Sequence, residues 1–145
     1  MSVTTRFFRF LEASEEDELF AAGAVKVFGE GQIIIDQDAL SRSIFLIEEG
    51  SVRVERQDRG AMIPLALLEV GEFFGEMSFV DGVATSARIV AEHPTRVRII
   101  DPATVDALAR NNPTFSGRLY RSIAAILAQR LRLTSMRLYA DQSWG

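Results

Sequence analysis

The chain has 145 residues, of which 48% are hydrophobic and 25% charged, a balance that favours one compact domain over residues 1–145 rather than a sensor joined to an effector domain. It contains no cysteine, one histidine (His93) and one lysine (Lys26), which lies outside any G-x-x-x-x-G-K-S/T sequence. This composition excludes disulfides, cysteine-based metal sites and nucleophiles, and a Walker-type nucleotide hydrolase. We therefore expect a protein that is not an enzyme and holds no metal.

The net charge of −4 is distributed unevenly along the chain. Residues 1–109 carry 10 basic and 19 acidic side chains, whereas residues 110–145 carry 6 basic and 1 acidic. The N-terminus lacks the apolar core of a signal peptide, and the longest apolar runs are too short to span a bilayer. The sequence thus predicts a cytoplasmic protein that does not enter a membrane.

A short helix and a series of strands are expected over the first hundred residues. Ser14-Glu15-Glu16-Asp17 has the spacing of a capping box, which predicts a helix that ends near Gly23. From about residue 25 to residue 100, short segments rich in Val, Ile, Leu and Phe alternate with turn residues, as is typical of a small antiparallel barrel or roll. The expected strands cover residues 25–28, 32–35, 43–49, 51–57, 64–70, 86–92 and 96–101.

Two further helices are expected over residues 102–140. Asp101-Pro102 suits an N-cap and first helical position and predicts a helix to Arg110, and Asn112-Pro113 repeats the signature ahead of a long last helix. In that helix an apolar stripe follows 4, 3 and 4 spacing, which predicts a twofold helix pair and hence a homodimer. The stripe consists of Leu127, Leu131, Thr134 and Leu138.

Residues 71–91, GEFFGEMSFVDGVATSARIVA, differ from a simple strand. Gly75 allows a sharp turn, Glu76–Phe79 can form one helical turn, and Asp81-Gly82 turns the chain back into a strand at Ser86. A short helix N-terminus beneath a tight turn directs free N–H groups at one point, which suits an anionic phosphate.

The order of these elements resembles the cyclic-nucleotide-binding domain family, of the cAMP receptor protein-like type but without a DNA-binding domain. The residues that carry the resemblance are F-G-E-M-S-F and A-T-S-A at the centre of the roll, an Asp-Pro helix and a long terminal helix. The resemblance implies an α+β, mainly β fold: a double-stranded β-helix of the jelly-roll type with short flanking helices and a long C-terminal helix.

The resemblance also implies a ligand site for a cyclic nucleotide, cAMP or cGMP. Glu76 would accept a hydrogen bond from the ribose 2′-hydroxyl, and an arginine just before Ser86 would hold the phosphate, but this sequence has Thr85 there. Loss of such a buried, charge-assisted contact costs about 2–5 kcal/mol. In a regular strand Arg88 faces away from Thr85 and is a poor substitute. The remaining implied cradle residues are Gly75, Met77 and Ser78.

The last helix adds three candidate ligand residues. Its A-Q-R-L-R-L-T-S sequence is similar to that of the family's long helix, which implies that Thr134 and Ser135 contact the base, one from each subunit, and that Arg130 lies on the phosphate side. Each assignment has a structural alternative. Thr134 and Ser135 can be ordinary small polar residues of a helix pair, and Glu76 can cap a turn or pair with Arg88 or Arg130.

Three functions remain open. The first is a sensor that binds cAMP or cGMP and signals through its C-terminal helix. The second, which Thr85 favours, is a ligand-free dimeric interaction module that regulates a separately encoded effector protein. The third is a fragment of a cAMP receptor protein-like transcription regulator. We expect no specific DNA binding by these 145 residues, because the acidic body repels phosphate and no recognition helix follows the long helix.

Overall fold

The structure, a computed structural model, describes residues 7–144, with side chains described for residues 7–138. Its elements run, in chain order, α1 (Ala13–Ala22), β1 (Ala24–Phe28), β2 (Ile33–Ile35), β3 (Ile44–Glu49), β4 (Ser51–Asp58), β5 (Ala61–Glu69), β6 (Phe73–Phe74), α2 (Glu76–Asp81), β7 (Arg88–Ala91), β8 (Thr95–Ile100), α3 (Pro102–Arg110) and α4 (Phe115–Trp144).

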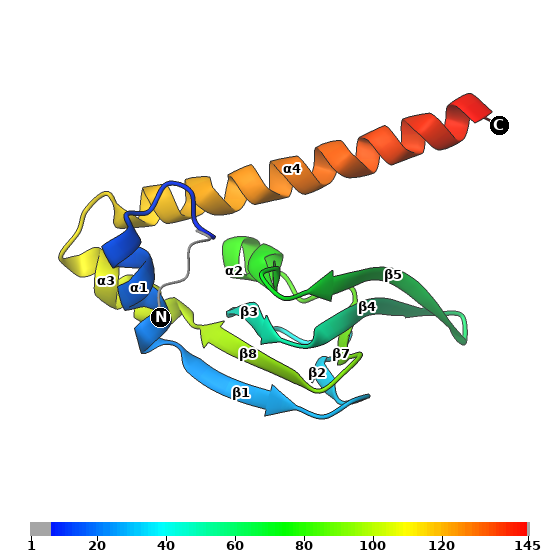
Figure 1. The fold of residues 1–145 in the computed structure, drawn as a ribbon, viewed down its shortest axis with the longest axis horizontal. Coiled ribbons are helices and arrows are strands. Elements are labelled where there is room, and N and C mark those ends of the chain that lie inside the picture. Colours follow the sequence, from blue (N-terminus) through cyan, green and yellow to red (C-terminus); the bar gives the residue numbers. More distant parts are fainter. Residues whose placement is uncertain (1–6, 145) are drawn as a thin grey trace.

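The strands form two four-stranded antiparallel sheets, in the orders β1-β8-β3-β6 and β2-β7-β4-β5 (Figure 1). Strands β3 and β6 of the first sheet are buried on both faces for most of their length, whereas β1 is exposed at four of its five residues. Alternate side chains of a strand point to opposite sides, so the two faces of β6 pack against different parts of the molecule. Phe73 packs with residues of the helices, whereas its neighbour Phe74 packs inside the roll. The mainly β, jelly-roll fold expected from the sequence is confirmed.

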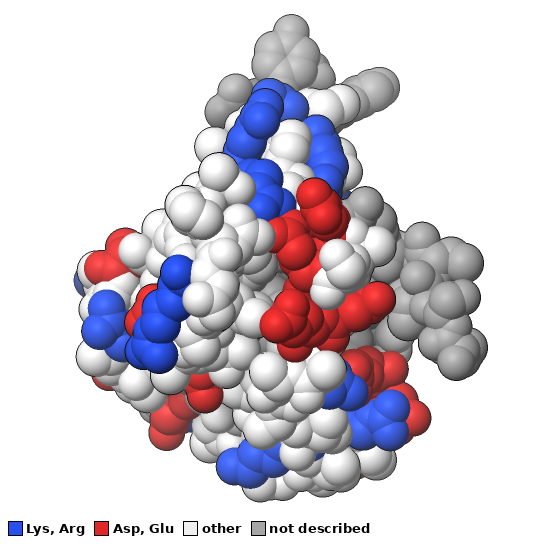
Figure 2. Space-filling model, turned by 90° about the vertical axis from the view of Figure 1, so that its left-hand side faces the viewer, with Lys and Arg blue, Asp and Glu red and all other residues white. Residues whose placement is uncertain are grey.

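Helices α1 and α3 and the start of α4 gather at one end of the roll, α2 lies between α4 and the strands, and α4 runs along the roll (Figure 1). The first half of α4 is anchored by Phe115, Leu119 and Ile123, all at most 1% exposed. Figure 2 views the end formed by α1, α3 and the start of α4, where acidic side chains gather below the basic side chains of the α4 side. The uneven charge along the chain is thus also uneven in space.

Three helix boundaries test the capping predictions. Asp101 caps α3 as expected, since its Oδ1 accepts a hydrogen bond from the Thr104 N–H at 2.8 Å. The capping box of α1 was placed two residues too late, because the N-cap is Glu12, whose N–H donates to Glu15 Oε1 at 2.8 Å. The last helix begins at Phe115 rather than at residue 113, because Asn112 first makes a turn in which its carbonyl accepts from the Phe115 N–H.

The strand expected from residue 86 begins only at Arg88. The reason is that Thr85 bonds to the loop after β2: its N–H donates to the Ala39 carbonyl, and its carbonyl accepts from the Asp38 N–H. Residues 83–87 therefore follow the loop between β2 and β3. Within the part of the chain that the structure describes, no helix is both long and apolar enough to cross a membrane.

Candidate functional site

Helix α2 and the turn before it position the centre of the site. Gly75 adopts φ 83° and ψ −3°, and a Cβ at this position would lie 2.5 Å from the Ser43 carbonyl oxygen. Only glycine fits such a left-handed residue pressed against a neighbouring strand. The predicted helical turn is present and extends to Asp81. The N–H groups of Glu76, Met77 and Ser78 have no carbonyl partner within α2, because the first three amides of a helix cannot bond to its backbone.

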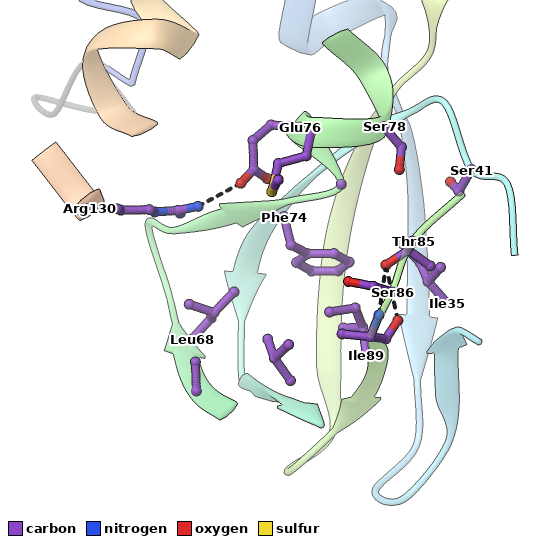
Figure 3. Close-up of a pocket in the computed structure, with 15 residues that line it drawn as sticks. Ile35, Ser41, Leu68, Phe74, Glu76, Ser78, Thr85, Ser86, Ile89 and Arg130 are labelled. Atoms are coloured by element: carbon purple, nitrogen blue, oxygen red, sulfur yellow. Dashed lines mark hydrogen bonds and ion pairs between the residues drawn. The ribbon is translucent and has the colours of Figure 1, made fainter. Parts of the chain in front are cut away.

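A cavity of about 290 Å³ opens beside this turn (Figure 3). Its volume is at the lower end of small-molecule pockets, which measure roughly 300–1,000 Å³. Most of its wall is apolar, with polar groups at two ends: Glu76 and Arg130 at one, hydroxyl groups at the other. The apolar lining consists of Ile35, Val54, Ala66, Leu68, Phe74, Ala87 and Ile89, and the hydroxyl groups belong to Ser41, Ser78, Thr85 and Ser86.

Glu76 is a buried carboxylate with one unused oxygen. Its residue is 6% exposed, and its Oε1 accepts a hydrogen bond from Arg130 Nη1 at 2.8 Å. Oε2 is buried and has no hydrogen-bond partner among the described residues. Burial raises the pKa of Glu76, and the opposing effects of its own backbone amide and of Arg130 do not cancel that rise. The cavity therefore contains an acceptor that a ligand hydroxyl could satisfy.

Arg130 joins α4 to this carboxylate. Its Nη2 donates to the Phe73 carbonyl at 2.9 Å, and its guanidinium lies 5.3 Å from the centre of the Phe73 ring. Of the two pairings considered for Glu76, the structure contains the one with Arg130. Arg88 instead pairs with Asp36, Nε to Oδ1 at 3.0 Å, and does not line the cavity.

Thr85 lies where the resemblance places the phosphate arginine, and its polar groups already have partners. Its Oγ1 donates to the Ala87 carbonyl at 3.0 Å and accepts from the Ala87 N–H at 3.3 Å. Ser78 is also engaged, since its Oγ donates to the Val83 carbonyl at 2.6 Å. Thr85 therefore contributes a wall to the cavity but no charge, whereas Ser86, which is exposed, contributes a hydroxyl.

Thr134 and Ser135 are the two candidates that the single chain does not bring to the cavity. Both are exposed on α4, and Thr134 Oγ1 donates back to the Arg130 carbonyl at 3.0 Å. Their proposed contact with a base stays a prediction. Met77, 65% exposed, lines the rim of the cavity. Among the described side chains, residues 7–138, no cluster of three or more potential metal ligands occurs.

Sequence reasoning missed Ser41 and the apolar walls of the cavity. Val54, Ala66 and Leu68 lie on paired strands at Val54↔Ala66 and Val52↔Leu68, so their alternation within β4 and β5 is a signal that could have identified one wall. Ser41 lies in an irregular loop, and no local pattern marks it.

Comparison with known proteins identifies the family. The profile of the cyclic nucleotide-binding domain matches residues 25–112, so the chain belongs to the cyclic nucleotide-binding domain family. It is 33% identical over 132 residues to the cyclic AMP receptor protein of Thermus thermophilus, covering 90% of this chain and 59% of that protein. It is 26% identical over 115 residues to cyclic GMP-binding protein C of Dictyostelium discoideum, covering 79% of this chain and 4% of that protein.

Solved structures show the same fold. The catabolite activator protein of Thermus thermophilus superposes with a TM-score of 0.76 at 32% identity, covering 91% of this chain and 61% of that one. A cyclic nucleotide-binding domain from Methylobacillus flagellatus superposes with a TM-score of 0.80 at 21% identity, covering 90% of this chain and 74% of that one. At this identity the likeness is one of fold alone. The chain thus spans less than two thirds of the length of the curated relatives described above.

Proposed function

We propose that the chain is a regulatory domain that binds cAMP or cGMP in the 290 Å³ cavity and does no chemistry on it. The observation that carries this proposal is Glu76 Oε2, a buried acceptor without a partner. An unsatisfied buried acceptor costs about 1–3 kcal/mol, which a hydrogen bond from a ribose 2′-hydroxyl would recover. Family membership supports the same ligand class.

The remaining lining suits the rest of a cyclic nucleotide. The amides of Met77 and Ser78, which have no backbone partner within α2, can donate to an anionic phosphate, and the apolar wall that includes Leu68 and Ile89 can receive the flat, weakly polar base. The Ser86 hydroxyl adds a donor at the end of the cavity opposite Glu76 and Arg130. These groups bind and orient a ligand.

Signalling through α4 rests on Arg130. This one side chain joins the helix to both Glu76 and the Phe73 carbonyl, so any ligand that changes the Glu76–Arg130 contact changes how α4 is held against the roll. A ligand shifts such an equilibrium only through different contacts in the two states, and this ion pair provides that difference.

A homodimer through α4 is the second part of the proposal. Leu131 is 67% exposed and Leu138 57% exposed, and a twofold helix pair would bury both stripes against each other. The exposed Thr134 and Ser135 lie on the same helix, where a second copy could bring them to a ligand.

Isothermal titration calorimetry with cAMP and cGMP tests the ligand, with 5′-AMP as the open-phosphate control. We expect saturable, micromolar binding of at least one cyclic nucleotide and weaker binding of 5′-AMP. A folded protein that gives no binding heat with either cyclic nucleotide up to millimolar concentration would refute the proposal.

A ligand-free interaction module for an effector protein is the alternative, and the uncharged, internally bonded Thr85 favours it. A dimer that binds no nucleotide would support this alternative. The Thermus relative extends beyond the matched region, which keeps a part of a larger transcription regulator as a third possibility. For the 145 residues alone, we expect no sequence-selective shift of duplex DNA in a gel assay.

A further inference from the structure

The charges that face the cavity balance only while the cavity holds no anion. Of the residues that line it, Glu76 and Arg130 are the charged ones, and they already form one ion pair at 2.8 Å. A cyclic phosphate adds one negative charge. The occupied site would then contain two anions and one cation, and all the rest of its lining is uncharged.

The described segments around the cavity supply no second cation. Arg88 on β7 is held by Asp36 on the outer side of the sheet. Arg42, in the loop between β2 and β3, lies with its guanidinium against Gly82, at the far end of α2 from Glu76. The position beside Ser86 is occupied by Thr85. The lining residues of β2, β4, β5, β6 and β7 are apolar, so Arg130 is the cavity-facing charged group opposite Glu76.

One of two anions that share a cation in a buried site becomes easier to protonate. A phosphodiester is a strong acid and keeps its charge near neutral pH, so the carboxyl group is the one that gains the proton. Its Oε2 is the buried oxygen without a partner, and burial already raises the pKa of Glu76. A protonated carboxyl can still bind a ribose hydroxyl, because it then donates its O–H to the hydroxyl oxygen.

We propose that the site takes up its cyclic nucleotide together with one proton from solvent, which Glu76 holds at Oε2 while Arg130 becomes the partner of the phosphate. This inference rests on the proposed function and adds its regulation: acidification strengthens binding and alkalinisation weakens it. It follows from Thr85, since an arginine there would supply the missing charge without a proton.

Calorimetry measures the proton directly. Wild-type protein is titrated with cAMP and with cGMP at pH 5.5, 6.5 and 7.5, and at pH 6.5 in PIPES and in imidazole, whose heats of ionisation differ. We expect the affinity to fall as the pH rises, by up to about tenfold per pH unit. The difference in heat between the two buffers should correspond to uptake of about half to one proton per nucleotide.

Two variants locate the proton. Thr85→Arg adds the second cation, so proton uptake should fall toward zero and the affinity should become nearly independent of pH. Ala84→Arg is the matched control, because Ala84 is exposed and does not line the cavity, and it should keep the wild-type proton uptake. Glu76→Gln is permanently neutral and keeps a donor for the ribose hydroxyl, so it should bind without proton uptake and lose the pH dependence.

Two outcomes would contradict these expectations in different ways. Wild-type binding with constant affinity from pH 5.5 to 7.5 and no proton uptake would overturn this inference and leave the proposed function intact. No binding of either nucleotide at pH 5.5, by wild type and by Thr85→Arg, would overturn the proposed function and this inference with it.

Discussion

At position 85 the chain has a threonine whose hydroxyl is fully used by the backbone of Ala87, two residues along. In the proposed complex, the adjoining Ser86 and the α2 turn offer polar groups to the nucleotide, and Thr85 supplies no positive charge. The effect of this residue on cyclic-nucleotide affinity can be tested by placing a positive charge at position 85.

Thr85→Arg should strengthen cyclic-nucleotide binding at pH 7.5 by at least tenfold, or about 1.4 kcal/mol, because it adds a charge-assisted contact to an existing cradle. Titration calorimetry of wild type, Thr85→Arg and the exposed control Ala84→Arg measures the effect. If both arginine variants gain equally, general charge attraction explains the gain. If neither wild type nor Thr85→Arg binds while both remain folded, the ligand-free alternative is correct.

Gly75 is the residue on which the geometry of α2 depends. Gly75→Ala should lower the free energy of unfolding by at least about 2 kcal/mol. A φ of 83° is unfavourable for alanine, and the alanine Cβ would meet the Ser43 carbonyl oxygen. Urea unfolding measures the change. Gly29→Ala is the control, since nothing lies within 4 Å of a Cβ there, and it should change stability by less than about 0.5 kcal/mol.

At the scale of elements, α1 is tied to the start of α4 by an ion pair between Glu15 and Arg118. Arg118 Nη2 donates to Glu15 Oε2 at 2.7 Å, a second bond joins Nη1 to Oε1, and Asn112 Nδ2 donates to Glu15 Oε2 at 2.6 Å. Hydrogen bonds from Arg118, with smaller effects of backbone and charge, lower the pKa of Glu15 to about 2.

Glu15→Gln should therefore lower the free energy of unfolding at pH 7 by about 1–2 kcal/mol. The pKa of Glu15 is lower in the folded than in the unfolded state, so its contribution is complete above about pH 4.5 and is lost as the pH falls toward 2. Urea unfolding at pH 7 and pH 3 should show a difference between wild type and variant that shrinks in acid. A difference that is equal at both pH values would exclude this ion pair as its source.

The elements that could be predicted from sequence are those with a local cause. Asp101-Pro102 specifies its own helix start, and alternating Val, Ile and Leu residues indicate seven of the eight strands. The start of α1 was placed two residues too late, because its N-cap is Glu12, and glutamate is not among the residues that usually mark an N-cap in a sequence. β6 has only two residues and becomes a strand by pairing with β3, so no periodicity reveals it.

The candidate site was predictable in part for the same reason. The turn at Gly75 and the helical turn that starts at Glu76 are local and were found from the residues themselves, whereas the ligand roles of Glu76 and Arg130 entered through the family resemblance. Its contact with Glu76 spans 54 residues of sequence and depends on how α4 packs on the roll. Ser41 and the walls from β4 and β5 arise only when the two sheets close around the cavity.

For the whole molecule, the proposed dimer depends on the exposed half of α4. Leu131→Glu should dissociate the proposed dimer, because it places a carboxylate in the middle of the buried stripe. Met136→Glu is a matched control: Met136 is equally exposed, at 67%, but lies about 140° away around the helix. Light scattering at micromolar concentration should report about 32 kDa for wild type and control and about 16 kDa for Leu131→Glu, from a chain mass of 16.1 kDa. A wild-type mass of about 16 kDa would contradict the proposed dimer.

The attachment of α4 also has a mechanical consequence. The helix has 30 residues and is buried against the core at Leu119. Arg130 contacts the roll about 16 Å farther along, and the last turn lies about 37 Å from Leu119. A straight rod pivoted at one end magnifies displacement in proportion to distance. A shift of about 1 Å where Arg130 meets the cavity would therefore move the far end of α4 by about 2 Å. The helix can convert a small rearrangement of one ion pair into a larger movement at its tip.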